Sequence, residues 1–128
     1  MPLYTVSTKD PLSDAERSGI AMMITDVHCG HTDAPRTFVQ TLFSQNVPLK
    51  QGVSLHIYAS VRAGRTHETN ELIKRDMIQQ AAHITGFVED GIEFALFEVP
   101  ASWVMEGGVV LPEPGEEEAW LKEHNRAG

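Results

Sequence analysis

The feature that most constrains the fold is a strand-helix-strand pattern that occurs twice along the chain. The first copy comprises a strand over residues 2–8, a helix over 14–29 and a strand over 37–44. The second comprises a strand over 55–62, a helix over 67–85 and a strand over 92–99. Corresponding elements are offset by roughly fifty residues, which predicts a duplicated β-α-β unit. Such a chain is expected to fold as an α+β structure, with one sheet and both helices on one of its faces.

Local signals predict where the two helices begin and end. Ser13 followed by Glu16 is a capping box, and Gly30 and Pro35 are expected to end the first helix. Thr66 is a good N-cap for the second helix, and Gly86 is expected to close it.

The chain of 128 residues is long enough for a single domain, with halves over about 2–44 and 54–99 and a C-terminal arm over 100–128. In the arm, residues 100–108, including Glu106, are expected to be irregular. The Glu run over 116–118 is expected to be the solvated first turn of a last helix, which Trp120 docks on a neighbouring surface.

Composition narrows the class of protein and its partners. The net charge of −8 opposes non-specific nucleic-acid binding. No run has the length and apolar character of a membrane span, and no signal peptide is visible, so we expect no membrane partner and a cytoplasmic location. The single Cys29 agrees with a reducing compartment. The sheet face left uncovered by two helices predicts an oligomer.

Two arginines in the second copy point to a site for an acid. Arg62 ends a strand in which Leu55, Ile57, Ala59 and Val61 are the buried face, so it should leave the strand on the opposite face. Arg65 lies just ahead of the second helix, where guanidinium groups and free helix N–H groups favour a carboxylate or phosphate. Replacing either arginine should hardly change stability, because neither lies on the apolar face of its element. The alternative is two solvated arginines on a surface turn.

The N-terminus offers a second reactive group. Aminopeptidases that remove Met1 before Pro2 would leave a secondary amine able to act as base, acid or nucleophile. For this amine to meet the anion site, the first strand has to lie beside the strand that carries Arg62. Duplication makes the first strands of the two halves natural neighbours, and we expect them to be parallel.

Short motifs spread over nearly the whole chain resemble the tautomerase superfamily, and within it the cis-3-chloroacrylic acid dehalogenase group. These motifs are Met-Pro-x-Tyr at the start, Ile24-Thr25-Asp26-Val27-His28, Ala34-Pro35-Arg36, Arg62-Ala63-Gly64-Arg65-Thr66, Glu98-Val99-Pro100, Met105-Glu106 and the segment Leu111 to Glu118. The resemblance implies a homotrimer of duplicated β-α-β chains. It also implies the site residues Pro2, His28, Arg62, Arg65 and Glu106.

This resemblance leaves two activities open. In a tautomerase, neutral Pro2 carries a proton from an enol oxygen to carbon while His28, Arg62 and Arg65 hold a small carboxylate substrate. In a hydratase or dehalogenase, Glu106 delivers water and the ammonium form of Pro2 protonates the alpha carbon. The sequence has Ala95 where the dehalogenase group has a tyrosine, and this departure favours the tautomerase.

Two further expectations concern non-protein groups and the alternative to catalysis. The spacing of His28, Cys29 and His31 matches no established metal site, so we expect no metal and no cofactor. If Met1 is retained, Pro2 is an amide without a basic lone pair, and the chain would be a non-catalytic, ligand-binding trimer.

Overall fold

The computed structural model describes residues 1–124, so the last four residues of the expected arm lie outside the described range. The two halves contain, in chain order, β1 (Leu3–Thr8), α1 (Asp14–Thr32), a 3-10 turn (Arg36–Phe38), β2 (Gln40–Ser44), β3 (Leu55–Arg62), α2 (His67–Thr85), a second 3-10 turn (Glu89–Gly91) and β4 (Ile92–Val99). The order confirms the predicted repetition of strand, helix and strand.

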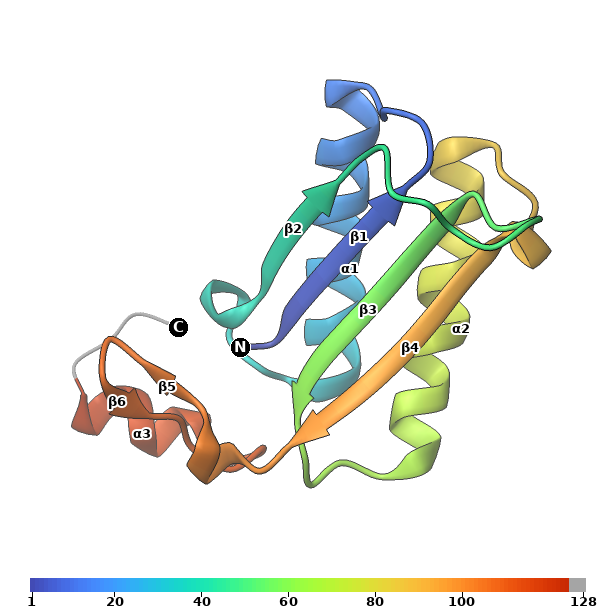
Figure 1. Cartoon of the computed structure of the whole chain (residues 1–128). Helices are drawn as coiled ribbons and strands as arrows, with labels where there is room; N and C mark the ends of the chain where they lie inside the picture. The colour runs from blue at the N-terminus through green and yellow to red at the C-terminus, as the bar shows by residue number, and fades with distance from the viewer. Residues whose placement is uncertain (125–128) are drawn as a thin grey trace.

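The four strands of the two halves form one sheet in the order β2-β1-β3-β4, as Figure 1 shows. Within each half the strands are parallel, since β1 pairs with β2 and β3 pairs with β4 in that orientation. The halves join through β1 and β3, which are neighbours as predicted, but antiparallel rather than parallel. The two halves are therefore related by a reversal of strand direction.

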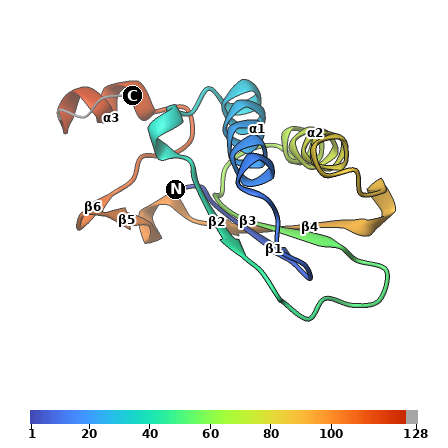
Figure 2. The ribbon, with the colours of Figure 1, turned by 90° about the horizontal axis from the view of Figure 1, so that it is seen from above.

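Both long helices cover the same face of the sheet, and the other face is open (Figure 2). The core lies between the sheet and the two helices. It contains every second side chain of β1 and β3, which are apolar, together with the apolar faces of the helices. Its fully buried members include Val6, Ile24, Ile57 and Met77. This arrangement confirms the expected α+β architecture.

The ends of the helices follow the capping chemistry, with one difference. The Ser13 and Glu16 capping box begins α1, and the Thr66 hydroxyl accepts from the backbone N–H of Thr69 at 3.1 Å at the start of α2. Helix α1 continues through Gly30 to Thr32 and ends at Asp33, whose φ of 58° is left-handed. The predicted end at Gly30 was wrong because Asp also tolerates the left-handed conformation.

The C-terminal arm lies across the end of the sheet where β3 and β4 finish and the N-terminus begins (Figure 1). It contains a 3-10 turn (Ala101–Trp103), a small hairpin of β5 (Met105–Glu106) and β6 (Val109–Val110), and the short helix α3 (Glu117–Glu123). Within residues 1–124, none of the helices has the length and apolar character needed to cross a bilayer.

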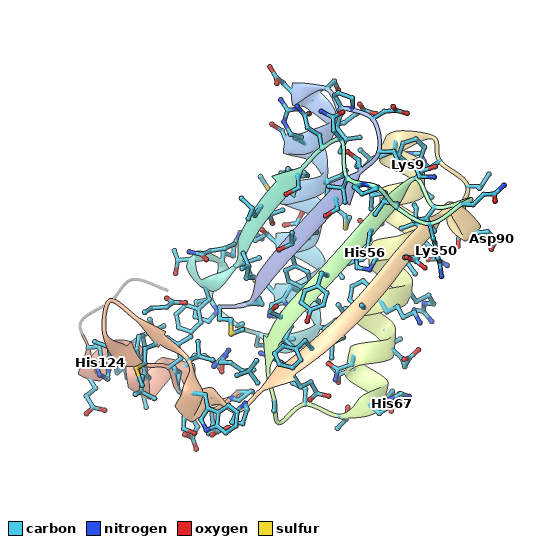
Figure 3. All side chains as sticks on the ribbon, viewed as in Figure 1. Lys9, Lys50, His56, His67, Asp90 and His124 are labelled. Carbon is cyan, nitrogen blue, oxygen red and sulfur yellow. The ribbon has the colours of Figure 1, made fainter. Side chains whose placement is uncertain are left out.

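The open face of the sheet carries polar and apolar side chains together. His56, labelled in Figure 3, stacks on Tyr58 with ring centroids 6.5 Å apart. Tyr58 is paired in register with Ala95 of β4, so the two residues share this face. Leu42 and Phe97 are also exposed there, with relative exposures of 55% and 53%.

Candidate active site

The antiparallel pairing of β1 and β3 brings the N-terminus to the site arginines. Leu3 is paired with Ser60, so the residues that precede Leu3 continue alongside Val61 and Arg62. Pro2 is fully buried, and its carbonyl accepts a hydrogen bond of 3.0 Å from the backbone N–H of Gln40. With the parallel pairing expected from the sequence, the N-terminus would have met the opposite end of β3. The antiparallel pairing is therefore what brings Pro2 to the end of β3 that carries Arg62.

Arg62 is buried beneath the C-terminal arm rather than solvated. Its side chain has a relative exposure of 0%, and Nη1 donates to the carbonyl oxygen of Pro112 at 2.6 Å. The guanidinium carbon lies 5.5 Å from the centroid of the Phe38 ring, within the range of a cation-π contact. Nη2 lies 4.0 Å from the Glu117 carboxylate, close enough for attraction between charges and too far for a hydrogen bond.

Arg65 approaches the same region from the turn before α2. Gly64 has a φ of 121°, a left-handed value that a side chain would strain, and it lies against Pro114 of the arm. Nη1 of Arg65 donates to the backbone carbonyl oxygen of Arg62 at 3.3 Å, which holds the Arg65 side chain at the end of β3. Burial lowers the pKa of Arg65, and burial followed by the charge of Arg65 lowers the pKa of Arg62.

His28 is fully buried on α1, and its Nδ1 lies 2.7 Å from the hydroxyl of Tyr4 on β1. Burial, with smaller contributions from Arg65 and Arg62, lowers the pKa of His28 to about 3, so the imidazole is neutral near pH 7. Burial raises the pKa of Tyr4, which keeps the phenol protonated. We assign the phenol as the donor to Nδ1, because the Tyr4 hydroxyl makes no other hydrogen bond within residues 1–124; the proton of the neutral ring is then on Nε2.

Glu106 completes the set from the arm. It lies on the short strand β5, not on an irregular loop as expected, and its carboxylate accepts from the Met1 ammonium group. This ammonium belongs to Met1, which is bonded directly to Pro2. The Glu106 carboxylate therefore lies within a few ångströms of the Pro2 nitrogen. The structure thus brings all five residues predicted from the sequence to one end of the sheet.

Several buried donors in this region make no hydrogen bond within residues 1–124. They are Nε2 of His28, Nε and Nη2 of Arg62, and Nη2 of Arg65. A buried donor without an acceptor is costly, and two of these side chains are positively charged. An anion with several acceptor oxygens, such as a carboxylate or a phosphate, would supply acceptors and a negative charge together. The described residues contain no group of three or more His, Cys, Asp or Glu side chains placed to hold a metal ion.

Sequence reasoning missed the roles of two residues at this site. Tyr4 was part of a motif without an assigned role, although a tyrosine that alternates with buried Val6 needs a partner for its hydroxyl. Glu117 was expected to be solvated, but it is buried and accepts from the backbone N–H of Gly115 at 2.5 Å. Its position three residues before buried Trp120 was the available signal, since residues at that spacing share a helix face.

Comparisons with known proteins agree on the family and the fold. The model of a family described as putative oxalocrotonate tautomerase enzyme matches residues 1–126. The solved structure of N1, a member of the cis-3-chloroacrylic acid dehalogenase family, is 27% identical with a TM-score of 0.87, covering 94% of this chain and 91% of that one. The structure of native Ps01740 is 32% identical with a TM-score of 0.75, covering 82% of this chain and 100% of that one.

More distant structures show the fold alone. A wild-type fused 4-OT, solved as an asymmetric trimer, is 19% identical with a TM-score of 0.76, covering 85% of this chain and 95% of that one. Among proteins with curated functions, none matches the chain.

Proposed function

The chain belongs to the family of putative oxalocrotonate tautomerases, and from this premise we propose that it is an isomerase that interconverts enol and keto forms of a small unsaturated or 2-oxo carboxylic acid. Pro2, after removal of Met1, is the catalytic base. The observation that carries the proposal is the set of buried donors of His28, Arg62 and Arg65 that make no hydrogen bond within residues 1–124 and lie beside the chain's N-terminus.

The arginines and the histidine play different parts in binding the substrate. Arg62 and Arg65 neutralise the carboxylate and draw electron density from a conjugated double bond. Neutral His28 donates from Nε2 to the carboxylate or to the adjacent carbonyl oxygen without adding charge. Burial strengthens each of these interactions, because water does not compete with the substrate for the donors.

Proton transfer then needs only one basic group. The Pro2 nitrogen removes the proton from the enol oxygen and delivers it to the carbon at the other end of the enol double bond, which leaves a ketone. The guanidinium groups favour the neutral amine needed for the first step, and Glu106 stabilises the ammonium that forms in between. The amine is neutral again after the second step.

The Pro2→Ala variant tests this proposal, with Pro11→Ala in the exposed loop before α1 as the matched control. Intact mass must first show that Met1 is absent from both proteins. Because a positioned general base contributes about a hundredfold or more, Pro2→Ala should lose at least that factor in kcat, measured by the ultraviolet absorbance of the enol. Wild-type turnover in Pro2→Ala would contradict the proposal, and a mass that includes Met1 would instead support a ligand-binding trimer.

A second activity, hydration or dehalogenation of 3-haloacrylate-type acids, is favoured by the contact of Glu106 with the N-terminal ammonium. A carboxylate in this place can take a proton from a water molecule as the water oxygen attacks the beta carbon. The Pro2 ammonium then protonates the alpha carbon. With Ala95 at the position of the dehalogenase tyrosine, this chain has one fewer group to activate water. We therefore assign it as the minor activity.

The active form is a homotrimer. The exposed apolar residues Leu42, Tyr58 and Phe97 gather on the open face of the sheet, where contact with other copies would remove them from water. The fused 4-OT structures of the same fold are trimers. Sedimentation equilibrium measures the mass in solution, and a monomer would contradict this assembly.

A further inference from the structure

A hydrogen bond between two side chains joins the long helices α1 and α2. Nε2 of His31, in the last turn of α1, lies 2.7 Å from Oδ2 of Asp76 on α2, and about a quarter of each side chain is exposed. The hydrogen bond with His31 lowers the pKa of the Asp76 carboxyl, so the carboxylate is ionised near pH 7 and accepts from the imidazole N–H. Arg75 contacts the other carboxylate oxygen, Oδ1, at 3.3 Å, which leaves Oδ2 to His31. Within residues 1–124, this is the one hydrogen bond between side chains of the two long helices.

The turn of α1 that carries His31 also carries His28, a donor of the proposed site. The two residues are three positions apart, so they are neighbours on the helix surface. Side-chain hydrogen bonds tie the backbone around them. The Thr32 hydroxyl donates to the His28 carbonyl oxygen at 2.7 Å and accepts from the backbone N–H of Ala34 at 3.2 Å. Because this turn is held as a unit, a shift of His31 along α2 carries His28 with it.

Apolar side chains also join α1 and α2. Ile73 and Met77 of α2 are buried in the same core cluster as Val27 of α1. Burial of apolar surface has no preferred direction, whereas a hydrogen bond weakens steeply as its angle and distance change. The pair of His31 and Asp76 is therefore the contact that defines where the end of α1 lies relative to α2.

From this geometry we propose that Asp76 is a positioning residue that acts on His28 through His31. It holds the end of α1 so that Nε2 of His28 faces the carboxylate group that Arg62 and Arg65 bind. Helix α2 begins two residues after Arg65, so the same contact fixes the donor on α1 relative to the donor that precedes α2. Asp76 itself does not touch the substrate. The inference rests on the proposed function, since it takes His28 as a donor to the substrate.

Imidazole nitrogen NMR and steady-state kinetics test this role in Asp76→Ala. The Nδ1 resonance of His28 should shift, because a displaced ring changes its hydrogen bond on that side. The same displacement should lower kcat/KM about three- to tenfold. His31→Ala should behave alike, and His31→Gln, which keeps a donor near the position of Nε2, should recover most of the loss. Asp26→Ala is the matched control, because it breaks an exposed ion pair of the same helix and should change neither measurement.

A double-mutant cycle distinguishes positioning of His28 from support of the fold. In His28→Leu the donor is absent, so adding Asp76→Ala should cost no further kcat/KM, whereas a loss of stability would add in both backgrounds. The pair is partly exposed, so Asp76→Ala should lower Tm by only a few degrees. If that variant does not fold, Asp76→Asn, which keeps an acceptor oxygen without the charge, takes its place and should show a smaller shift of the same resonance.

The outcomes separate this inference from the proposed function. It is overturned if the His28 nitrogen resonances are the same in Asp76→Ala and the wild type, if Asp26→Ala loses as much activity, or if the losses in the cycle are additive. A lowered Tm with unchanged kinetics leaves the pair a structural role alone and also overturns it. If the wild-type chain neither converts enols nor binds propionate in titration calorimetry, the proposed function fails, and the His28 resonances still decide whether Asp76 positions the ring.

Discussion

Arg62 and Arg65 carry the same charge, but we predict that their replacement by Ala has different consequences. Arg62 is buried and donates to Pro112 at 2.6 Å, with Phe38 beneath its guanidinium group. A hydrogen bond from a charged donor contributes about 1.5–3 kcal/mol and a cation-π contact about 0.5–2 kcal/mol. The variant regains part of the cost of burying a charge, so the net loss should be about 2–4 kcal/mol.

The same structure predicts a smaller effect on stability at Arg65. Its one hydrogen bond within the described residues is the 3.3 Å contact with the carbonyl oxygen of Arg62, and its side chain is only half-buried. From the sequence alone, replacing either arginine is expected to leave stability nearly unchanged. The structure alters this expectation for Arg62 only, because Arg62 is buried under the arm.

Thermal melts and steady-state kinetics measure the two effects separately. At roughly 3–6 °C for each kcal/mol in a chain of this size, Arg62→Ala should lower Tm by about 6–24 °C. Arg65→Ala should leave Tm within a few degrees and still lower kcat/KM for a carboxylate substrate at least about tenfold. The uncharged ester of that substrate should lose less, because it has no carboxylate to bind.

Two comparisons make this prediction refutable. Arg36→Ala removes an exposed arginine paired with Asp26 and should change neither quantity much. Arg65→Lys should restore the activity only in part, because a point charge lacks the planar fork. The reasoning is wrong if the two Ala variants melt together, or if Arg65→Ala loses acid and ester activity in the same proportion.

Three further predictions follow from the contacts of the site. Tyr4→Phe removes the donor to Nδ1 of His28, so nitrogen NMR should show a mixture of imidazole tautomers and kcat/KM should fall about three- to tenfold with the fold intact; a single Nε2-protonated form in the variant would contradict the assignment. The His28 pKa is lowered from 6.5 to about 3, so its neutral burial stabilises the fold above pH 6.5 and this contribution is lost as the pH falls toward 3. The Tm difference between wild type and His28→Gln should therefore shrink between pH 6.5 and pH 4, and a constant difference would refute this. Glu106→Gln should suppress hydration of an acrylate-type acid, followed by proton NMR, much more than it slows enol-keto conversion, in which Glu106 only stabilises the ammonium that forms on Pro2; an equal loss of both activities would contradict this division of roles.

The fold was predictable to the extent that it depends on short-range patterns. Alternation and capping residues located β3, β4 and α2, since each signal lies within a few residues of the element it defines. The sequence predicted that β1 and β3 are neighbours in the sheet, but not the direction in which they pair. That direction depends on how the loop over residues 45–54 returns the chain, and no local pattern encodes that path.

The residues of the candidate site could be proposed from the sequence, but their environment could not. His28, Arg62 and Arg65 are of residue types that bind acids, and a resemblance to known proteins named them together. Burial of Arg62 depends on the arm, whose docking is decided by contacts such as that between Trp120 and Phe38, far apart in the sequence. The same long-range packing buries Glu117, which local charge patterning assigned to the solvent.

The direction of one strand pair connects the duplication to the chemistry. Each copy of the β-α-β unit begins with its first strand, β1 or β3. If these two strands paired in parallel, the start of β1 would lie beside the start of β3. The observed antiparallel pairing aligns the start of β1 with the end of β3 instead. The start of β1 supplies an amine and the end of β3 supplies Arg62, while α2 begins immediately beyond with Arg65. The N-terminal residues and two fixed positive charges then meet because two similar halves are related by reversal, and this arrangement needs no group from the middle of either strand.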